Sequence, residues 1–177
     1  MTTIELVRHG DAQGRDRWWG KPDRDRPLSD VGHDQAKRLA GELNAAGDVD
    51  ALYSSPFMRC VQTLQPLADS LGARIQPEDA LAEATTLPVL DGGDAWVASA
   101  WLGGRAMALL NRIVATHPGG RVVACSHGDI IPAVMAVLAG RDDLGIPDVR
   151  LAKGARFTLQ FADGRCVRAV PSPPPNG

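Results

Sequence analysis

Four basic side chains stand in sequence contexts that suit chemistry on an anion. Arg8 and His9 directly follow one short apolar run, and His127 follows a second. Arg59 comes shortly after a proline that is typical of a helix start, so it falls in a first helical turn. Guanidinium groups donate paired hydrogen bonds to phosphate oxygens, and the free amides of a helix N-terminus add partial positive charge. Together with the lone glutamate Glu83, this set suits an oxyanion substrate, and phosphate is the best candidate.

The elements that must position these residues alternate between strand and helix. Apolar runs predict strands at 4–7, 49–54, near 74–75 and at 121–125, and a closing β-hairpin at 157–161 and 166–170. Helical spacing of apolar residues and capping signals predict helices at 29–47, 55–71, 94–116 and 130–138. Val31 is expected on the apolar face of the first helix, and Gly103-Gly104 is expected to weaken the third.

This alternation predicts a three-layer α/β fold with a mainly parallel sheet and helices on both faces. Ligands of such sheets bind outside the carboxyl ends of the strands. His9 and His127 both follow the ends of predicted strands. The fold class therefore predicts that the two histidines lie at the same edge of the sheet.

The composition fits a globular protein and excludes several classes of partner. The 177 residues, 44% of them hydrophobic, fit one domain, assigned to residues 1–170, with a Pro-rich tail at 171–177 that is expected to be disordered. A net charge of -2 gives no general attraction to nucleic acid polymers or to anionic membranes, and no segment approaches 18 continuous apolar residues. Three scattered cysteines fit neither a disulfide framework nor a zinc site and favour a reducing cytoplasm; they receive no catalytic role. The oligomeric state has no signature in the sequence.

Three segments taken together resemble the signatures of the histidine phosphatase, or phosphoglycerate mutase-like, superfamily. They are Leu6-Val7-Arg8-His9-Gly10, the segment from Ser54 to Thr63, and Ser126-His127-Gly128, and they occur in the family's order and spacing. The likeness covers residues 3 to 170. It implies the phosphoglycerate mutase-like fold and a hydrolase that removes phosphate from phosphomonoesters or phosphoanhydrides through a phosphohistidine intermediate.

The resemblance also implies roles for individual residues. His9 attacks phosphorus, while Arg8, Arg59 and His127 bind the phosphate oxygens as charge shifts. Neither a metal ion nor another cofactor is needed, because a neutral imidazole is already a nucleophile and the arginines supply positive charge. Glu83 stands where many family members place the acid that protonates the leaving oxygen and later activates water. Glu78 lies close by in the sequence and is the alternative acid, and some phosphohistidine phosphatases lack this acid.

Departures from the mutase-like members bear on the substrate. In those members the first signature continues with a serine and then an asparagine, and the asparagine lies five residues past the glycine. This chain has Ala12 in place of the serine and Arg15 in place of the asparagine. Arg15 is therefore a candidate phosphate-binding residue. The loop from Arg15 to Arg26 holds five basic and three acidic residues, which either create a local positive field or neutralise one another. Trp18 and Trp19 in this loop serve either packing or substrate stacking.

Within the superfamily two likenesses stand out. Segments 15–20, 26–28 and 130–132 resemble the phosphatase domain of MutT-like two-domain hydrolases, which pair it with a Nudix domain and act on nucleotides. Segments 8–12 and 55–57 resemble SixA-type phosphohistidine phosphatases. The predicted partner is thus a phosphorylated small molecule, nucleotides included, or a phosphohistidine protein. A mutase would need inserted segments that 177 residues leave little room for, and a non-catalytic phosphate-binding module would have lost His9 or an arginine.

Overall fold

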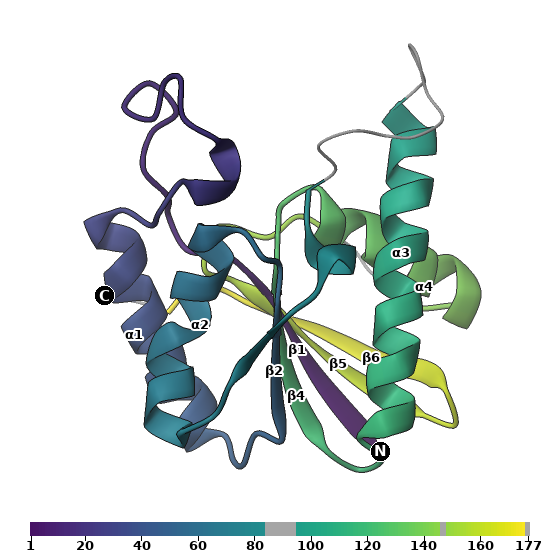
Figure 1. The fold of residues 1–177 in the computed structure, drawn as a ribbon. Coiled ribbons are helices and arrows are strands. Elements are labelled where there is room, and N and C mark those ends of the chain that lie inside the picture. The colour runs from purple at the N-terminus through teal and green to yellow at the C-terminus, as the bar shows by residue number, and fades with distance from the viewer. Residues whose placement is uncertain (84–94, 146–147, 176–177) are drawn as a thin grey trace.

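The computed structural model describes residues 1–83, 95–145 and 148–175, and this part of the chain is built on one six-stranded sheet (Figure 1). In chain order the strands are β1 (Thr2–Arg8), β2 (Ala51–Ser54), β3 (Ile75–Pro77), β4 (Arg121–Ser126), β5 (Arg156–Ala162) and β6 (Arg165–Ser172). Their order in the sheet is β3-β2-β4-β1-β5-β6. Strands β1 to β4 run parallel to one another, whereas β5 is antiparallel to β1 and β6 is antiparallel to β5. The predicted mainly parallel sheet is confirmed, with an antiparallel hairpin at one edge.

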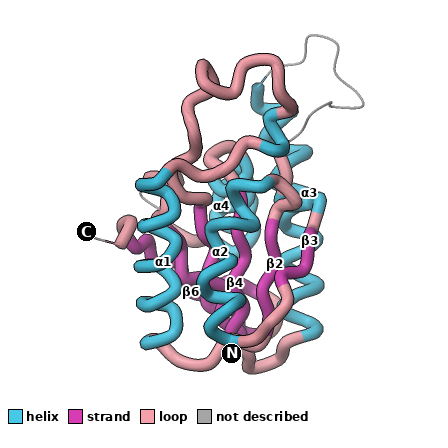
Figure 2. The backbone as a smooth tube through the Cα atoms, turned by 60° about the vertical axis from the view of Figure 1, so that its left-hand side comes forward, coloured by secondary structure: helices cyan, strands magenta, loops and turns pink. Residues whose placement is uncertain are grey.

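Helices cover both faces of the sheet (Figures 1 and 2). They are α1 (Asp30–Ala45) and α2 (Met58–Leu71), which pack together on one face, and α3 (Ala95–Thr116) and α4 (Ile130–Asp142), which pack together on the other. Along β4, Val123 and Cys125 join the core under α1 and α2, while Val122 and Ala124 join the core under α3 and α4. Because β4 is buried on both faces, its sequence reads as a continuous apolar run.

The parallel register brings the two histidine loops together. Arg8 at the end of β1 pairs with Ser126 at the end of β4, so His9 and His127 leave adjacent strands at the same edge. The backbone N–H of His9 donates to the carbonyl of Ser126 at 3.0 Å and so extends the ladder past the strand. β2 lies on the other side of β4, so α2 begins beside the same edge.

The long polar loop between β1 and α1 stands above this edge of the sheet (Figures 1 and 2). An antiparallel bridge between Ala12 and Leu28 closes the loop at its base. Leu28 N–H also donates to Gln62 Oε1 on α2 at 2.8 Å. A short 3-10 helix, η1 (Asp23–Asp25), lies within the loop, and a second, η2 (Asp79–Leu81), follows β3. The bridge and the contact with α2 fix where the loop stands.

One helix start was predicted wrongly. α2 begins at Met58 instead of Ser55-Pro56, because the Ser55 hydroxyl accepts a hydrogen bond from the N–H of Phe57 at 3.3 Å and forms a turn ahead of the helix. α3 runs unbroken through Gly103-Gly104. A Cβ at Gly103 would lie 2.7 Å from the carbonyl oxygen of Ala133, so this glycine permits the close approach of α4.

Two further expectations need correction. Val31 is 59% exposed, since the buried face of α1 is formed instead by Gly32, Ala36, Leu39, Ala40 and Leu43. β6 continues through Pro171 and Ser172, so the domain boundary expected after residue 170 falls inside a strand. Pro171 pairs with Phe157 in the edge strand of the sheet, where proline is tolerated. In the described ranges no helix is both long and apolar enough to cross a membrane.

Candidate active site

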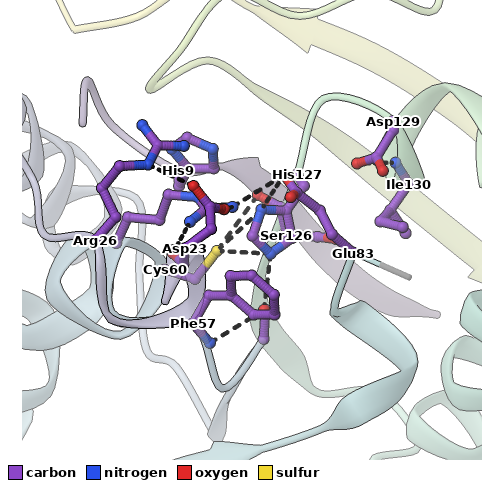
Figure 3. Close-up of polar contacts among 12 residues, drawn as sticks. His9, Asp23, Arg26, Phe57, Cys60, Glu83, Ser126, His127, Asp129 and Ile130 are labelled. Carbon is purple, nitrogen blue, oxygen red and sulfur yellow. Dashed lines mark hydrogen bonds and ion pairs between the residues drawn. The ribbon is translucent and has the colours of Figure 1, made fainter. Parts of the chain in front are cut away.

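The predicted site residues converge beyond the carboxyl ends of β1 and β4 (Figure 3). The ring centroids of His9 and His127 lie 5.3 Å apart, with their planes inclined by 65°. Glu83 Oε1 lies 3.1 Å from Nδ1 of His127 and 3.0 Å from Nη2 of Arg59. The side chains of Arg59 and His127 are fully buried, and His9 is only 6% exposed. The structure thus gathers into one cluster of contacting side chains residues that are more than 110 positions apart in the sequence.

His9 is held as a neutral imidazole with a free lone pair. Its Nδ1 lies 2.7 Å from the carbonyl oxygen of Gly10, which can only accept, so Nδ1 carries the proton and Nε2 does not. Gly10 is itself fixed, since its N–H donates to the hydroxyl of Thr63 on α2 at 3.0 Å. Burial lowers the pKa of His9 to about 3, and the nearby charges of His127, Arg59 and Arg8 act in the same direction. Nε2 is therefore an available nucleophile at neutral pH.

His127 is held in the opposite state. Burial alone would lower its pKa, but Cys60 and the Glu83 carboxylate outweigh burial and raise the pKa to about 9. Nε2 of His127 lies 2.8 Å from the Ser55 hydroxyl and 3.5 Å from Cys60 Sγ, while Nδ1 faces Glu83. The site therefore places a cationic donor beside a neutral imidazole, and two groups in opposite protonation states are what acid–base and charge-stabilising roles require.

The two arginines carry buried donors that no group in the described residues accepts. Arg59 Nη1 donates to the carbonyl of Asp23 at 2.9 Å, and Nη2 lies 3.1 Å from the Asp23 carboxylate, but Nε has no partner. Arg8 binds the carbonyl of Leu151 through Nη1, and its Nε is likewise unpaired. A Cβ at Gly128 would lie 2.7 Å from Arg8 Cζ, so only glycine admits this guanidinium. Buried unpaired donors are costly, and an anion bound between the two arginines would satisfy them.

Glu83 contacts Arg59 and His127, two of the cationic groups that such an anion would need. Burial would raise the pKa of this carboxyl, but contact with His127 and Arg59 lowers it to about 2, so Glu83 is ionised. Glu78, the alternative acid considered from the sequence, instead forms an ion pair with Arg112 on α3. Of the two glutamates, therefore, only Glu83 contacts the residues of this pocket.

A cavity of about 580 Å³ opens above these groups, and a single phosphate group would fill only a small part of it. Its lining residues beyond the inner site include Arg15, Arg26, Lys153 and Asp129. The position of Arg15 agrees with the prediction that the loop borders the pocket. Arg17, by contrast, lines a neighbouring hollow with Asp11 and Ser29 and is not among the residues that line this cavity.

The acidic residues of the loop neutralise only part of its positive charge. Asp23 accepts from Nε of Arg26 at 2.8 Å and pairs with Arg59, whereas Nε of Arg15 lies 4.0 Å away. The side chain of Arg15 is 78% exposed. Asp23 thus serves the buried arginine and Arg26, and Arg15 keeps a charge that an incoming anion can use.

Sequence reasoning missed three residues of the site. Cys60, set aside with the other cysteines, contacts His127, and Ser55 hydrogen-bonds the same ring. Asp23 reaches Arg59 from the loop. Ser55 and Cys60 both lie within the segment 54–63 that carries the resemblance, so their place beside Arg59 was a usable signal. No sequence signal identified Asp23, because its contact with Arg59 depends on how the loop folds over α2.

Comparison with known proteins places the chain in a family. The model of the histidine phosphatase superfamily (branch 1) matches residues 4–87 and 100–170, which is most of the chain. The chain belongs to the histidine phosphatase superfamily. The resemblance expected from the three sequence segments is confirmed, and the residues gathered in the pocket are those that the matched segments contain.

Two curated relatives show how far the likeness extends beyond the superfamily. The 8-oxo-(d)GTP phosphatase of Mycolicibacterium smegmatis is 32% identical over 176 residues, which are 98% of this chain and 49% of that protein. The transcription factor tau 55 kDa subunit of Saccharomyces cerevisiae is 34% identical over 93 residues, 47% of this chain and 21% of that protein. The chain therefore spans about half the length of the first relative and a fifth of the second.

Several solved structures share the fold. YhfR of Bacillus stearothermophilus superposes with a TM-score of 0.76 at 20% identity and 94% coverage of each chain. A phosphoserine phosphatase of Entamoeba histolytica gives 0.70 at 20% identity, again with 94% of each chain covered. The protein histidine phosphatase SixA, bound to tungstate, gives 0.61 at 24% identity over 96% of this chain and 94% of its own. At these identities the likeness concerns the fold alone.

Proposed function

We propose that this chain is a metal-independent phosphatase in which His9 takes the phosphoryl group from the substrate. The observation that carries the proposal is an arrangement of charges: the neutral, buried imidazole of His9 lies beside the cationic His127. Two guanidinium groups, of Arg8 and Arg59, have buried Nε donors without an acceptor. Such donors stabilise the charge that develops on equatorial oxygens during in-line transfer. Families that share this fold host different chemistries, so the assignment rests on these groups.

The proposed reaction has two steps that regenerate the site. Nε2 of His9 bonds to phosphorus as the bond to the leaving oxygen breaks, and that oxygen takes a proton from Glu83. Water then attacks the phosphohistidine, gives its proton to Glu83, and releases phosphate with His9 neutral again. In the free protein Glu83 is bound by His127 and Arg59. An incoming phosphate takes over these two donors, and its negative charge raises the proton affinity of the displaced carboxylate, so Glu83 takes up a proton from solvent before transfer. After phosphate leaves, Glu83 returns that proton to solvent and binds His127 and Arg59 again.

A metal ion is the main chemical alternative, because ligand atoms of His9, Glu83 and His127 lie within 4.8 Å of one another. The donor set fits a metal poorly. His127 has a pKa of about 9 and would have to lose its proton, and the buried cation of Arg59 stands 3.0 Å from the Glu83 carboxylate. Hydrolysis of an aryl phosphate should therefore proceed unchanged in excess chelator. A loss that added Zn²⁺, Mg²⁺ or Mn²⁺ restores would point to metal-assisted hydrolysis instead.

Replacing Glu83 by Gln should have two effects of opposite sense. Turnover of an alkyl phosphate should fall on the order of 10²- to 10⁴-fold, because the alkoxide needs a proton at departure, whereas release of nitrophenolate from an aryl phosphate should suffer far less. Vanadate should bind more tightly, because the carboxylate that competes for His127 and Arg59 is gone. Steady-state rates on both substrates and vanadate inhibition measure this. Equal rate losses on both substrates, with weaker vanadate inhibition, would contradict the assigned role.

The pH profile should have an alkaline limb set by His127. With an aryl phosphate, whose leaving group needs no proton from Glu83, kcat/KM should fall as the pH rises through the His127 pKa of about 9, because His127 donates only while protonated. Protonation of His9 limits the rate only near pH 3. Because Cys60 helps to raise the pKa of His127, Cys60→Ala should move the alkaline limb to lower pH. Cys166→Ala, which removes a buried cysteine outside the site, is the control. An alkaline limb that stays in place in Cys60→Ala would show that another group sets it.

The substrate we propose is a phosphorylated small molecule, with nucleotides first. A relative 32% identical is named an 8-oxo-(d)GTP phosphatase, and the exposed cation of Arg15 on the cavity wall suits a second phosphate. A phosphohistidine protein is the competing substrate, as the fold likeness to SixA allows. Parallel assays with nucleotides, a phosphohistidine protein and sugar phosphates decide between them. We place the activity in the cytoplasm, where the three free buried cysteines stay reduced.

A further inference from the structure

A second cavity, of about 660 Å³, adjoins the catalytic one and has a different lining. The two share Arg15, Arg26 and Glu83 as a common wall. We propose that the second cavity binds the nucleobase of a nucleotide whose terminal phosphate is transferred to His9, with Trp19 as the stacking surface. This inference rests on the proposed phosphatase function and adds the part of the protein that selects the leaving group. Beyond this common wall, the aromatic and basic members of the lining are Trp18, Trp19, Phe57, Lys21 and Arg24.

Two of the three aromatic rings are already engaged and form fixed walls. The indole N–H of Trp18 donates to the carbonyl of Pro22 at 2.9 Å, and Lys21 Nζ lies over the ring at 4.4 Å from its centroid. Phe57 is 4% exposed, carries the Arg59 guanidinium over its face at 4.7 Å, and meets the His127 ring edge-on at 5.0 Å. Phe57 therefore lies between the second cavity and two residues of the catalytic site, Arg59 and His127.

Trp19 differs from these rings because it lies on the cavity wall and is 88% exposed. An indole left in water forgoes the burial that a tryptophan normally gains on folding. Aromatic side chains that stand exposed beside a positively charged groove are the feature on which proteins stack bases, because every base offers a π-face. Lys21 and Arg24 supply the positive charge around this ring.

The order of groups along the two cavities matches the order of groups in a nucleoside diphosphate. Arg8 and His9 line the catalytic cavity, Arg15 lies on the wall common to both, and Trp18 and Trp19 line the second cavity. A phosphoryl group on His9 would place the second phosphate near Arg15, whose charge is only loosely paired with Asp23 at 4.0 Å. The nucleoside then extends into the aromatic cavity.

The test compares substrates that differ only in the presence of a base. Trp19→Ala should raise the KM for GDP by roughly 5- to 160-fold, the range expected for the loss of one base stacked on an aromatic side chain, and leave the KM for pyrophosphate unchanged. Trp96→Ala, which removes another exposed indole that lines neither cavity, is the matched control and should leave both values unchanged.

Arg15→Ala should raise the KM for GDP more than that for glycerol 2-phosphate. In the His9→Ala protein, GDP should quench tryptophan fluorescence, and the added Trp19→Ala change should remove most of that quenching.

The outcomes separate this inference from the proposed function. Wild-type protein that hydrolyses glycerol 2-phosphate, together with Trp19→Ala protein whose KM for GDP is unchanged, would overturn the nucleobase site and leave the phosphatase intact. Equal KM increases for GDP and pyrophosphate would show that Trp19 supports the loop and does not contact a base. A loss of activity in Trp19→Ala that is confined to a phosphohistidine protein would assign the exposed indole to protein docking and would likewise overturn the nucleobase site. Failure of the wild-type protein to release phosphate from any of these substrates would overturn the proposed function itself.

Discussion

Replacing His9 by Ala should reduce phosphatase activity on every substrate on the order of 10⁴-fold or more, because loss of the nucleophile removes the covalent route and leaves only the binding groups. The fold should survive. Although His9 is 94% buried, its side chain makes one hydrogen bond, to the carbonyl of Gly10, and its backbone bond to Ser126 is kept by alanine. The measurement is kcat with an aryl phosphate and with a nucleotide, alongside the thermal unfolding midpoint.

His33→Ala is the matched control for this change, since His33 is an exposed histidine on α1 outside the pocket. It should retain wild-type rates. If inactive His9→Ala protein still binds vanadate, the change has removed the proposed nucleophile and left the anion-binding site intact. Residual activity within tenfold of the wild type would show that water attacks the substrate directly and that His9 only binds it.

Replacing Arg59 by Ala should cost about 2–4 kcal/mol of transition-state stabilisation, as does removal of a donor that faces developing oxyanion charge. That cost corresponds to a fall in kcat/KM of roughly 30- to 900-fold. Its physical basis is the full burial of Arg59 and the unpaired Nε. The change also leaves Asp23 and Glu83 without their shared cation, so the loop from Arg15 to Arg26 should become more susceptible to proteases.

Arg59→Lys keeps the charge but not the forked donors, and so isolates the contribution of geometry. It should remain folded and recover only part of the lost rate. Complete recovery by lysine would mean that point charge suffices and that the unpaired Nε has no part in binding phosphate. An Arg59→Ala protein with a wild-type kcat/KM would remove Arg59 from the site altogether.

The sequence was sufficient for the sheet and for the inner site. The apolar runs before His9 and His127 place both residues at strand ends, and the parallel pairing of these strands then brings the rings to 5.3 Å. Arg59 followed from a helix start that was misplaced by about three residues, yet it still fell in the first turn. The error did not affect the placement of Arg59, because Arg59 lies in the first turn of the helix with either start.

Other features depend on contacts that no local pattern encodes. Which of Glu78 and Glu83 lies beside the inner site depends on the course of the chain after β3: Glu78 pairs with Arg112, whereas Glu83 pairs with Arg59. Arg15 and Arg17 are equally basic and two positions apart, yet they line different cavities. Their separation follows from the way the loop folds between its closing bridge and η1, which charge and composition do not specify.

The central claim, that the phosphoryl group passes through His9, is tested most directly by trapping the intermediate. The protein is mixed with an excess of substrate labelled in the transferred phosphate, quenched within milliseconds in alkaline denaturant, digested, and analysed by mass spectrometry. The account predicts one phosphate on the peptide that contains His9, lost on acid treatment, absent from His9→Ala, and formed at least as fast as the steady-state turnover. Turnover without any protein-bound phosphate, or phosphate on a residue other than His9, would contradict it.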